Sequence, residues 1–233
     1  MGCDIHVYTE VKKDGQWVST DRWETETNDD GSERVYRPYE SSIYSERNYD
    51  LFAILADVRN GVGFAGCDTG EGFVPISSPK GMPENASVEV KNVAESWDAD
   101  GHSHSWVTLA ELLAYDWTQT TTLRGYVTAP VYYDWNRYDR KNGNGPEVTC
   151  GAFFGPNVQE VPNDIMDALI TETIKDQKSP RKAVEENLGN VFTQASWQRP
   201  YYKCAAYFFS IVIPQLLRMG APEDVRLVFF FDN

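Results

Sequence analysis

The stretch that decides the fold is CDIHVYTEVKKDGQWVSTDRW, residues 3–23. Two runs of alternating polar and apolar residues flank the sequence KDGQ, in which Asp14 and Gly15 can supply the positive φ angles of a tight turn. Alternate residues of a strand point to opposite sides of a sheet, so each run predicts one buried face and one polar face. The stretch therefore predicts an N-terminal β-hairpin.

The polar face of the first predicted strand is rich in reactive groups. One face carries Ile5, Val7, Thr9 and Val11, and the other carries Asp4, His6, Tyr8 and Glu10. Two carboxylates, an imidazole and a phenol in one row exceed what a solvated face needs, although most half-buried strands show a polar outer face. Asp4 and His6 are therefore candidates for chemistry.

The rest of the chain alternates between helical and extended patterns, which predicts an α+β fold. The almost wholly apolar run DVRLVFFFDN, residues 224–233, predicts a central strand of a mixed or antiparallel sheet. Further strand is expected around LRGYVTAPVYYDW, residues 123–135. About four helices should pack on this sheet, and their expected positions are residues 48–60, 109–117, 164–176 and 202–218.

Local signals mark the ends and the irregularities of these helices. Asn48 is expected to be an N-cap, and Thr108 with Glu111 forms a capping box. Pro214 should kink the last helix, because proline has no backbone N–H and its ring crowds the preceding turn.

The chain is expected to form a single globular domain over residues 1–233. The polar segment of residues 24–35 predicts a mobile loop. The Gly- and Pro-rich segment of residues 61–83 is too long for a simple connection, and its aromatic residues favour an ordered loop that lines or covers a pocket.

Composition limits the partners of the chain. Its net charge is −14, with 35 acidic and 21 basic side chains, which argues against duplex nucleic acid. A small anion is still compatible with this charge, because a local cluster of arginines reverses the field over a few ångströms. No apolar run is long enough to span a bilayer, so no membrane partner is expected. A homo-oligomer is compatible with the sequence.

The four cysteines have no CxxC spacing, and no secretory signal precedes them. They are interpreted as reduced thiols, which predicts a cytoplasmic location. Cys3 could be a nucleophile activated by His6, but a small core residue is the more ordinary role of a cysteine at the start of a strand.

The three histidines give the sharpest functional signal. His102 and His104 form GHSHS just ahead of a predicted helix N-terminus, where backbone N–H groups favour an anion, and His6 lies in DIH. On an extended segment both imidazoles of an H-x-H motif project to the same side, about 7 Å apart along the chain. That spacing suits two ligands of one metal ion or two acid–base groups around one phosphorus atom. The simpler alternative is that both side chains only hydrogen-bond within a loop.

These signals define a candidate site. The expected catalytic residues, which could also bind Zn²⁺ or Mn²⁺, are Asp4, His6, His102 and His104. Guanidinium groups grip phosphate and aromatic rings stack on nucleobases. The residues expected to bind substrate are therefore Tyr8, Arg47, Trp106 and Arg124.

Four segments carry a resemblance to a known family. The start MGCDIH, the segment RNYDLFAILADVRN, the run DGHSHSWVTLAELLAYDW and the ending DVRLVFFFDN together resemble a family of uncharacterised proteins encoded by tailed bacteriophages and prophages. The resemblance covers most of the chain. It implies phage origin and expression in the host cytoplasm, and it carries no activity.

Three classes of function are compatible with the sequence. The first is a hydrolase that cleaves a phosphodiester in a small nucleotide-like anion, which would counter host nucleotide immune signalling. The second is a binding protein that sequesters such a nucleotide without cleaving it. The third is an acidic decoy that blocks a host protein by charge, and the clustering of the histidines argues against it. We expect the hydrolase.

Overall fold

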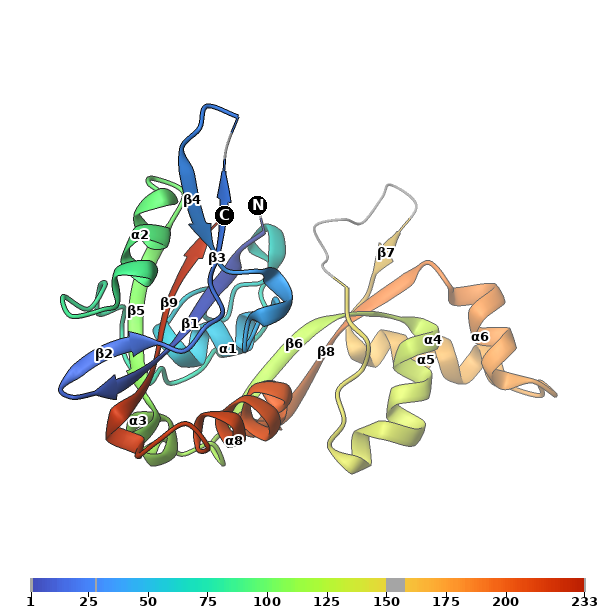
Figure 1. Cartoon of the computed structure of the whole chain (residues 1–233). Helices are drawn as coiled ribbons and strands as arrows, with labels where there is room; N and C mark the ends of the chain where they lie inside the picture. Colours follow the sequence, from blue (N-terminus) through green and yellow to red (C-terminus); the bar gives the residue numbers. More distant parts are fainter. Residues whose placement is uncertain (1, 28, 150–157, 233) are drawn as a thin grey trace. The chain divides into compact units, whose positions relative to one another are not determined.

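The first and last strands of the sequence pair at the centre of the main sheet (Figure 1). A computed structural model describes residues 2–27, 29–149 and 158–232. In it, β1 (Asp4–Lys13) pairs antiparallel with β9 (Val225–Asp232), β5 (His102–Thr108) pairs with the other side of β9, and β2 (Gln16–Ser19) pairs with β1. The order β2-β1-β9-β5 confirms the predicted hairpin and the predicted central strand in an α+β fold.

The turn between β1 and β2 has the geometry that its sequence predicts. Asp14 and Gly15 have φ angles of 51° and 82°. Positive φ at both central residues is the signature of a type I′ turn, whose twist matches that of the strands it joins.

The described residues group into two compact units, whereas the sequence predicted a single domain. Unit 1 takes the described residues of Met1–Asn60, Phe73–Trp117 and Tyr202–Asn233, and unit 2 takes those of Gly61–Gly72 and Thr118–Tyr201. The chain therefore leaves unit 1 twice and returns to it twice.

Hydrogen bonds within unit 1 join the residues that flank each of the two segments of unit 2. We call each of these inserted segments an excursion. The side-chain amide of Asn60 donates to the carbonyl of Phe73 at 2.8 Å and accepts from the backbone N–H of Phe73 at 2.7 Å. At the second excursion, the N–H of Tyr202 donates to the carbonyl of Trp117 at 3.0 Å. The backbone of unit 1 is thus bridged at each point where the chain departs.

Helices cover both faces of the main sheet. α2 (Val88–Ser96) packs on the face that carries Phe230. α1 (Tyr49–Ala56) packs on the opposite face, where the rings of Phe52 and Phe231 lie 5.2 Å apart. Successive residues of a strand point to opposite faces, so the apolar run of β9 is buried on both sides.

The predicted helix caps are present in unit 1. The side chain of Asn48 accepts a backbone N–H from the first turn of α1 at 3.2 Å. Thr108 and Glu111 form the predicted capping box at the start of α3 (Leu109–Ala114). α3 ends at Ala114, three residues before the predicted end.

The predicted helix of residues 202–218 is also present, with an irregular middle. It consists of α7 (Tyr201–Cys204), a π-helical turn at Phe208–Val212 and α8 (Ile213–Leu216). Val212 and Ile213, which join the π-helical turn to α8, have helical φ and ψ angles, so Pro214 lies inside a continuous helical stretch. A π-helical turn precedes Pro214, and the kink stays a prediction.

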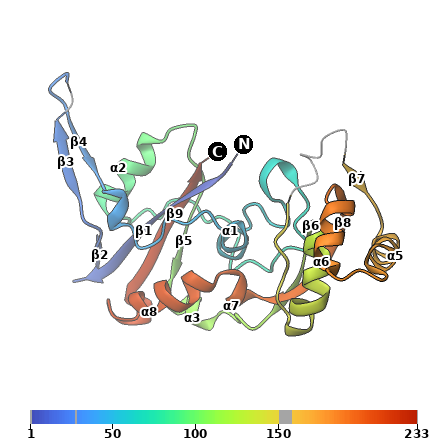
Figure 2. The same ribbon diagram turned by 90° about the vertical axis from the view of Figure 1, so that its right-hand side faces the viewer.

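Two elements of unit 1 differ from the prediction. β3 (Glu24–Thr27) and β4 (Glu33–Tyr36) form an antiparallel hairpin where the sequence predicted a mobile loop, and Figure 2 shows this hairpin as a separate two-stranded ribbon. Both strands are largely exposed, so they lack the apolar alternation on which strand prediction depends. α2 was not predicted, because only Val90 and Ala94 of its residues are buried.

Unit 2 is a three-stranded sheet with helices. Its order is β6-β8-β7, and its elements are β6 (Thr120–Thr128), α4 (Ala129–Asp134), β7 (Gln159–Glu160), α5 (Asn163–Ile174), α6 (Pro180–Leu188) and β8 (Val191–Pro200). The predicted strand of residues 123–135 ends at Thr128, whose side chain caps α4, and Pro130 favours the first turn. α5 confirms the predicted helix of residues 164–176. None of the helices in the described part of the chain is long and apolar enough to cross a bilayer.

The cysteines differ in state. Cys3 and Cys204 are buried thiols, as expected. Cys67 is disulfide-bonded, which corrects the expectation that it is reduced.

A buried ion pair joins β1 to β9, although Glu10 was expected on a polar outer face. Glu10 is 0% exposed and Arg226 is 2% exposed. The Nε of Arg226 donates to Glu10 at 2.7 Å, and the N–H of Ser87 donates to the same carboxylate at 2.6 Å. The guanidinium also donates to Asn85 and lies 4.0 Å from the ring centroid of Trp17. The segment that leads into α2 therefore covers this part of the sheet.

Removing one partner of this pair should destabilise the protein strongly. Glu10→Gln should lower the free energy of unfolding by about 3–5 kcal/mol, because Arg226 then keeps a buried charge without its carboxylate. Arg22→Gln is the control, since it breaks an exposed pair with Glu24 and should cost less than about 1 kcal/mol. Chemical denaturation of both variants measures the difference, and equal losses would contradict a structural role for the buried pair.

Candidate functional site

His6 is held in an aromatic cluster on the α2 side of the main sheet. Its ring centroid lies 4.3 Å from that of Trp97 and 4.7 Å from that of Phe230. Its Nε2 lies 3.1 Å from a carboxylate oxygen of Asp232, and 22% of its side chain is exposed. A carboxylate bound to one ring nitrogen fixes the orientation of the imidazole and leaves Nδ1 for another partner.

His104 lies on the other side of the same phenylalanine. Its ring is stacked on Phe230 at a centroid distance of 5.1 Å. His6 comes from β1 and His104 from β5, and these two strands flank β9. The structure therefore brings His6 and His104 together, as the sequence predicted.

His102 does not share this arrangement, because a bulge interrupts β5. The pairing of β5 with β9 shifts between His102 and Ser105, and Ser103 has a φ of 50°. The ring of His102 stacks on Phe231, at 6.1 Å, rather than on Phe230. The expectation that both imidazoles project to the same side is therefore wrong, since a bulge changes the facing of the residues that follow it.

The surroundings of His104 favour its neutral form. Burial lowers the pKa of His104 below the ordinary histidine value, and the nearby His102 lowers this pKa further. A neutral imidazole can accept a proton, so His104 can act as a base. Burial raises the pKa of the Cys3 thiol, which supports the core role of Cys3 and argues against a nucleophile.

Asp4 positions an arginine beside His6. The Nε of Arg47 donates to one oxygen of Asp4 at 2.7 Å, and a second guanidinium nitrogen contacts the other oxygen. This hydrogen bonding holds the pKa of the Asp4 carboxyl below its usual value. The N–H of Asp4 donates to Asp232 at 3.2 Å, so Asp4, Arg47, His6 and Asp232 are linked through shared partners. The Arg47 side chain is about half exposed and can reach a ligand.

The other residues expected to bind substrate have structural partners. Tyr8 is 3% exposed and belongs to the core, which leaves no surface for a ligand. The Nζ of Lys80 lies 4.3 Å from the ring centroid of Trp106. Arg124 belongs to unit 2 and donates to Asp68 at 2.7 Å. Arg47 is thus the predicted substrate residue that combines an exposed charge with a connection, through Asp4 and Asp232, to His6.

A pocket of about 540 Å³ opens beside His104. This volume is within the range of sites for small molecules. The pocket is lined by Met82, Pro83, Glu84, Lys91, Ala94, Glu95, Asp98 and His104. Its wall is acidic, with one ammonium against three carboxylates, so it suits the uncharged part of a ligand better than a phosphate.

The predicted loop of residues 61–83 reaches this pocket only at its end. Met82 and Pro83 line the pocket, and the N–H of Gly81 donates to the carbonyl of His104 at 2.8 Å. The first part of the loop, Gly61–Gly72, belongs to unit 2 instead.

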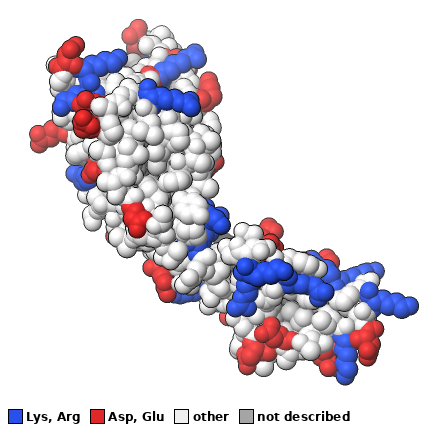
Figure 3. Space-filling view, turned by 90° about the horizontal axis from the view of Figure 1, so that it is seen from below, with Lys and Arg blue, Asp and Glu red and all other residues white. Residues whose placement is uncertain are grey.

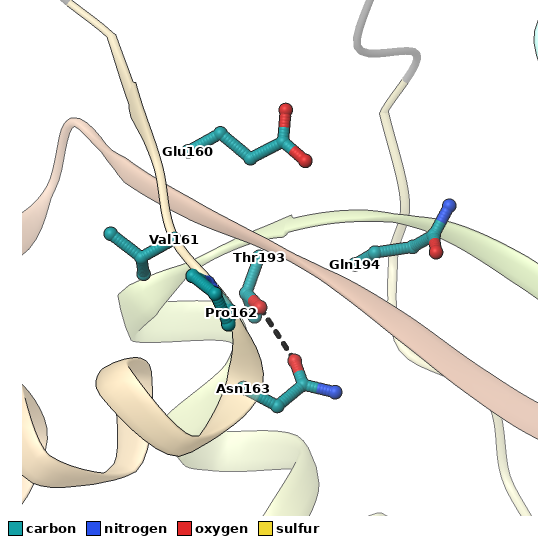
Figure 4. Close-up of a pocket in the computed structure, with 6 residues that line it drawn as sticks. All are labelled: Glu160, Val161, Pro162, Asn163, Thr193 and Gln194. Atoms are coloured by element: carbon teal, nitrogen blue, oxygen red, sulfur yellow. Dashed lines mark hydrogen bonds between the residues drawn. The ribbon is translucent and has the colours of Figure 1, made fainter.

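A second pocket, of about 490 Å³, lies within unit 2 at the start of α5 (Figure 4). The hydroxyl of Thr193 donates to the amide oxygen of Asn163 at 2.5 Å, and the Glu160 side chain extends away from this pair. None of the predicted site residues lines this pocket. The carboxylate of Glu160 argues against an anion there.

The four predicted metal ligands do not form one set. Over residues 2–27, 29–149 and 158–232, no group of three or more His, Cys, Asp and Glu side chains could hold a metal ion. The ring of Phe230 separates His6 from His104, and Arg47 engages the carboxylate of Asp4. In the described part of the chain these four residues do not form a shared ligand set, and the Zn²⁺ or Mn²⁺ ion stays a prediction.

Comparison of the chain with protein-family models, curated proteins and solved structures finds no match.

Two residues of the site were not singled out for it from the sequence. Asp232 and Phe230 were interpreted as parts of an apolar central strand, and their contact with His6 depends on pairing across more than two hundred residues. An acidic residue at the end of an otherwise apolar strand is the one local signal that could have drawn attention to Asp232.

Titration of the imidazoles tests the electrostatics of the site. In an NMR titration, His104 should have a midpoint below the ordinary histidine value of about 6.5. His102→Ala should raise that midpoint, because it removes a neighbouring positive charge, while the remaining burial should keep it below the ordinary value. An unchanged midpoint in His102→Ala would contradict the coupling between the two histidines.

Proposed function

We propose that this protein binds a small nucleotide-like anion and hydrolyses a phosphodiester bond in it. One observation carries the proposal: His6, oriented by Asp232, and His104 lie on either side of Phe230. Cleavage of a phosphodiester at neutral pH needs a base for the attacking water and an acid for the leaving oxygen. An in-line displacement places these two groups on opposite sides of the phosphorus atom. The buried ring of Phe230 lies between the two imidazoles, so the phosphate would have to lie outside that ring, where both side chains reach it.

The surroundings of each histidine suggest its role. His104 has a lowered pKa, so it is the base that accepts the proton of the attacking water. His6 is the acid that donates a proton to the leaving oxygen from the nitrogen that Asp232 does not bind. Asp232 orients the ring, as carboxylates do for catalytic histidines.

Arg47 supplies the positive charge for the phosphate. A guanidinium has five N–H donors, and Asp4 engages only Nε and one terminal nitrogen. The contact with Asp4 pre-orients the guanidinium, which lowers the entropy that is lost when a phosphate binds. Asp4 is then a positioning residue rather than a group that contacts the reacting atoms.

The acidic pocket beside His104 suits the nucleoside part of the substrate. Glu84, Glu95 and Asp98 can accept hydrogen bonds from the N–H and O–H groups of a base and a sugar. The same carboxylates repel additional phosphates, so a substrate with few charges is favoured. A cyclic or linear dinucleotide satisfies both conditions.

The biological context that we propose comes from the sequence resemblance alone. A phage-encoded protein that acts in the host cytoplasm and destroys a small nucleotide would counter host immune signalling. Sequestration without cleavage is the second candidate. The size of the pocket supports it, because the pocket can hold a nucleoside without any cleavage step.

Turnover of defined nucleotides tests the proposal. Purified protein is incubated with a panel of cyclic and linear dinucleotides, and the products are separated by chromatography. His6→Ala and His104→Ala should each reduce the rate by about 10²- to 10⁴-fold, because each removes one proton-transfer group. His102→Ala is the matched control and should reduce it less, since His102 lies against Phe231.

The alternatives give different results in the same experiment. Release of intact nucleotide from the heated protein, with binding weakened in His104→Ala, would replace hydrolysis by sequestration. Failure of every nucleotide to bind would overturn both functions. Elemental analysis of the purified protein tests the Zn²⁺ or Mn²⁺ prediction independently, because it needs no substrate.

A further inference from the structure

The helical stretch from Tyr202 to Met219 exposes an unusual amount of apolar surface. Within unit 1 its exposed apolar side chains are Tyr202, Tyr207, Phe209, Ile211, Leu217 and Met219. A helix normally buries its apolar side chains, whereas this stretch packs against the core through residues such as Phe208, Val212 and Leu216 and leaves six apolar side chains exposed. We call the exposed side of this stretch the helix face.

The helix face also lacks acidic residues, although the chain as a whole is strongly acidic. The chain has 35 acidic residues, yet none lies between Glu186 and Glu223. Figure 3 shows a broad area without Lys, Arg, Asp or Glu on the larger unit, on the side where Figure 1 places α8. Exposed apolar patches of this kind mark interaction sites in soluble proteins.

From these observations we propose that the helix face is the contact between two copies of this chain in a two-fold dimer. Two molecules with a net charge of −14 repel each other over most of their surfaces. The helix face has no carboxylate, and charges farther than about 8 Å from it are screened at physiological salt. It is therefore the surface on which two copies can approach most closely.

The middle of the helix face allows two helices to cross. Ala206 and Ser210 are both exposed, and residues four apart lie on the same side of a helix. These small residues let the backbones approach, while Tyr207 and Ile211 can pack beside the crossing point. The hydroxyl of Ser210 donates to the carbonyl of Ala206 at 2.6 Å, so a second copy can cover it without leaving an unpaired donor.

The ends of the helix face are compatible with this crossing. Lys203 and Arg218 lie about 10–12 Å from Ser210 along the helix axis. Crossed helices diverge away from their contact point, so these cations of one copy need not meet those of the other. In a two-fold contact each residue near the axis meets its own equivalent, which makes the arrangement directly testable.

Sedimentation velocity over a range of protein concentrations tests the dimer. The wild-type chain should form dimers at micromolar concentrations, and the double variant Phe209→Glu with Ile211→Glu should be monomeric, because it places carboxylates on both sides of the contact. Val35→Glu is the matched control, since Val35 is an exposed apolar residue of β4 in the same unit and its variant should remain dimeric. Circular dichroism establishes that each variant is folded.

A crosslink gives an independent readout. Ser210→Cys should form a covalent dimer under mild oxidation, because equivalent residues near a two-fold axis approach each other, whereas Val35→Cys should not. A wild-type chain that is monomeric at every concentration would overturn the proposal and leave the helix face to a different partner. A dimer that survives the double glutamate variant would also overturn it, because its contact would lie elsewhere.

Discussion

The buried ion pair between Glu10 and Arg226 is the constraint on which unit 1 depends. Both charges lose their hydration, so each has to remain paired and hydrogen-bonded. β1 and β9 must then align in one register, and the segment that carries Asn85 and Ser87 must close over them. The same register places His6 opposite Phe230 and pairs Asp4, at the start of β1, with Asp232, at the end of β9. The geometry of the candidate site is thus a consequence of how a distant part of the sheet satisfies its charges.

A single irregular residue decides which histidines share the site. In a regular strand, His102 and His104 would face the same way, and the candidate site would contain a pair of adjacent imidazoles. Ser103 breaks the regularity of β5, so the pair is divided between the two faces of the sheet. The imidazole that joins His104 comes instead from β1, on the other side of Phe230. Two strands that are far apart in the sequence therefore supply the two imidazoles that contact Phe230.

Features with a local cause could be predicted from the sequence, and features with a distant cause could not. The turn at Asp14 and Gly15, the cap at Asn48 and the capping box at Thr108 each depend on a few adjacent residues, and all of them are present. The burial of Glu10 depends on Arg226, which no local pattern connects to it. The contact of His6 with Asp232 has the same origin. The division into two units could not be predicted from local sequence patterns either, because unit 2 consists of two segments that are separated in the sequence.

The hydrogen bonds that join the flanks of the two inserted segments affect the order in which the sheets can fold. Asn60 is hydrogen-bonded to Phe73, and Trp117 is hydrogen-bonded to Tyr202. The residues of unit 1 that flank each inserted segment of unit 2 are therefore in direct contact. The paired residues of β6 and β8 are 64 to 80 positions apart in the sequence, whereas those of β1 and β9 are more than two hundred apart, so β6 and β8 can pair earlier. Once the inserted segments have collapsed, the effective separation between β1 and β9 is much smaller, and the entropy lost in closing that loop falls accordingly. If unit 2 folds first, it increases the rate at which β1 and β9 pair in the main sheet of unit 1.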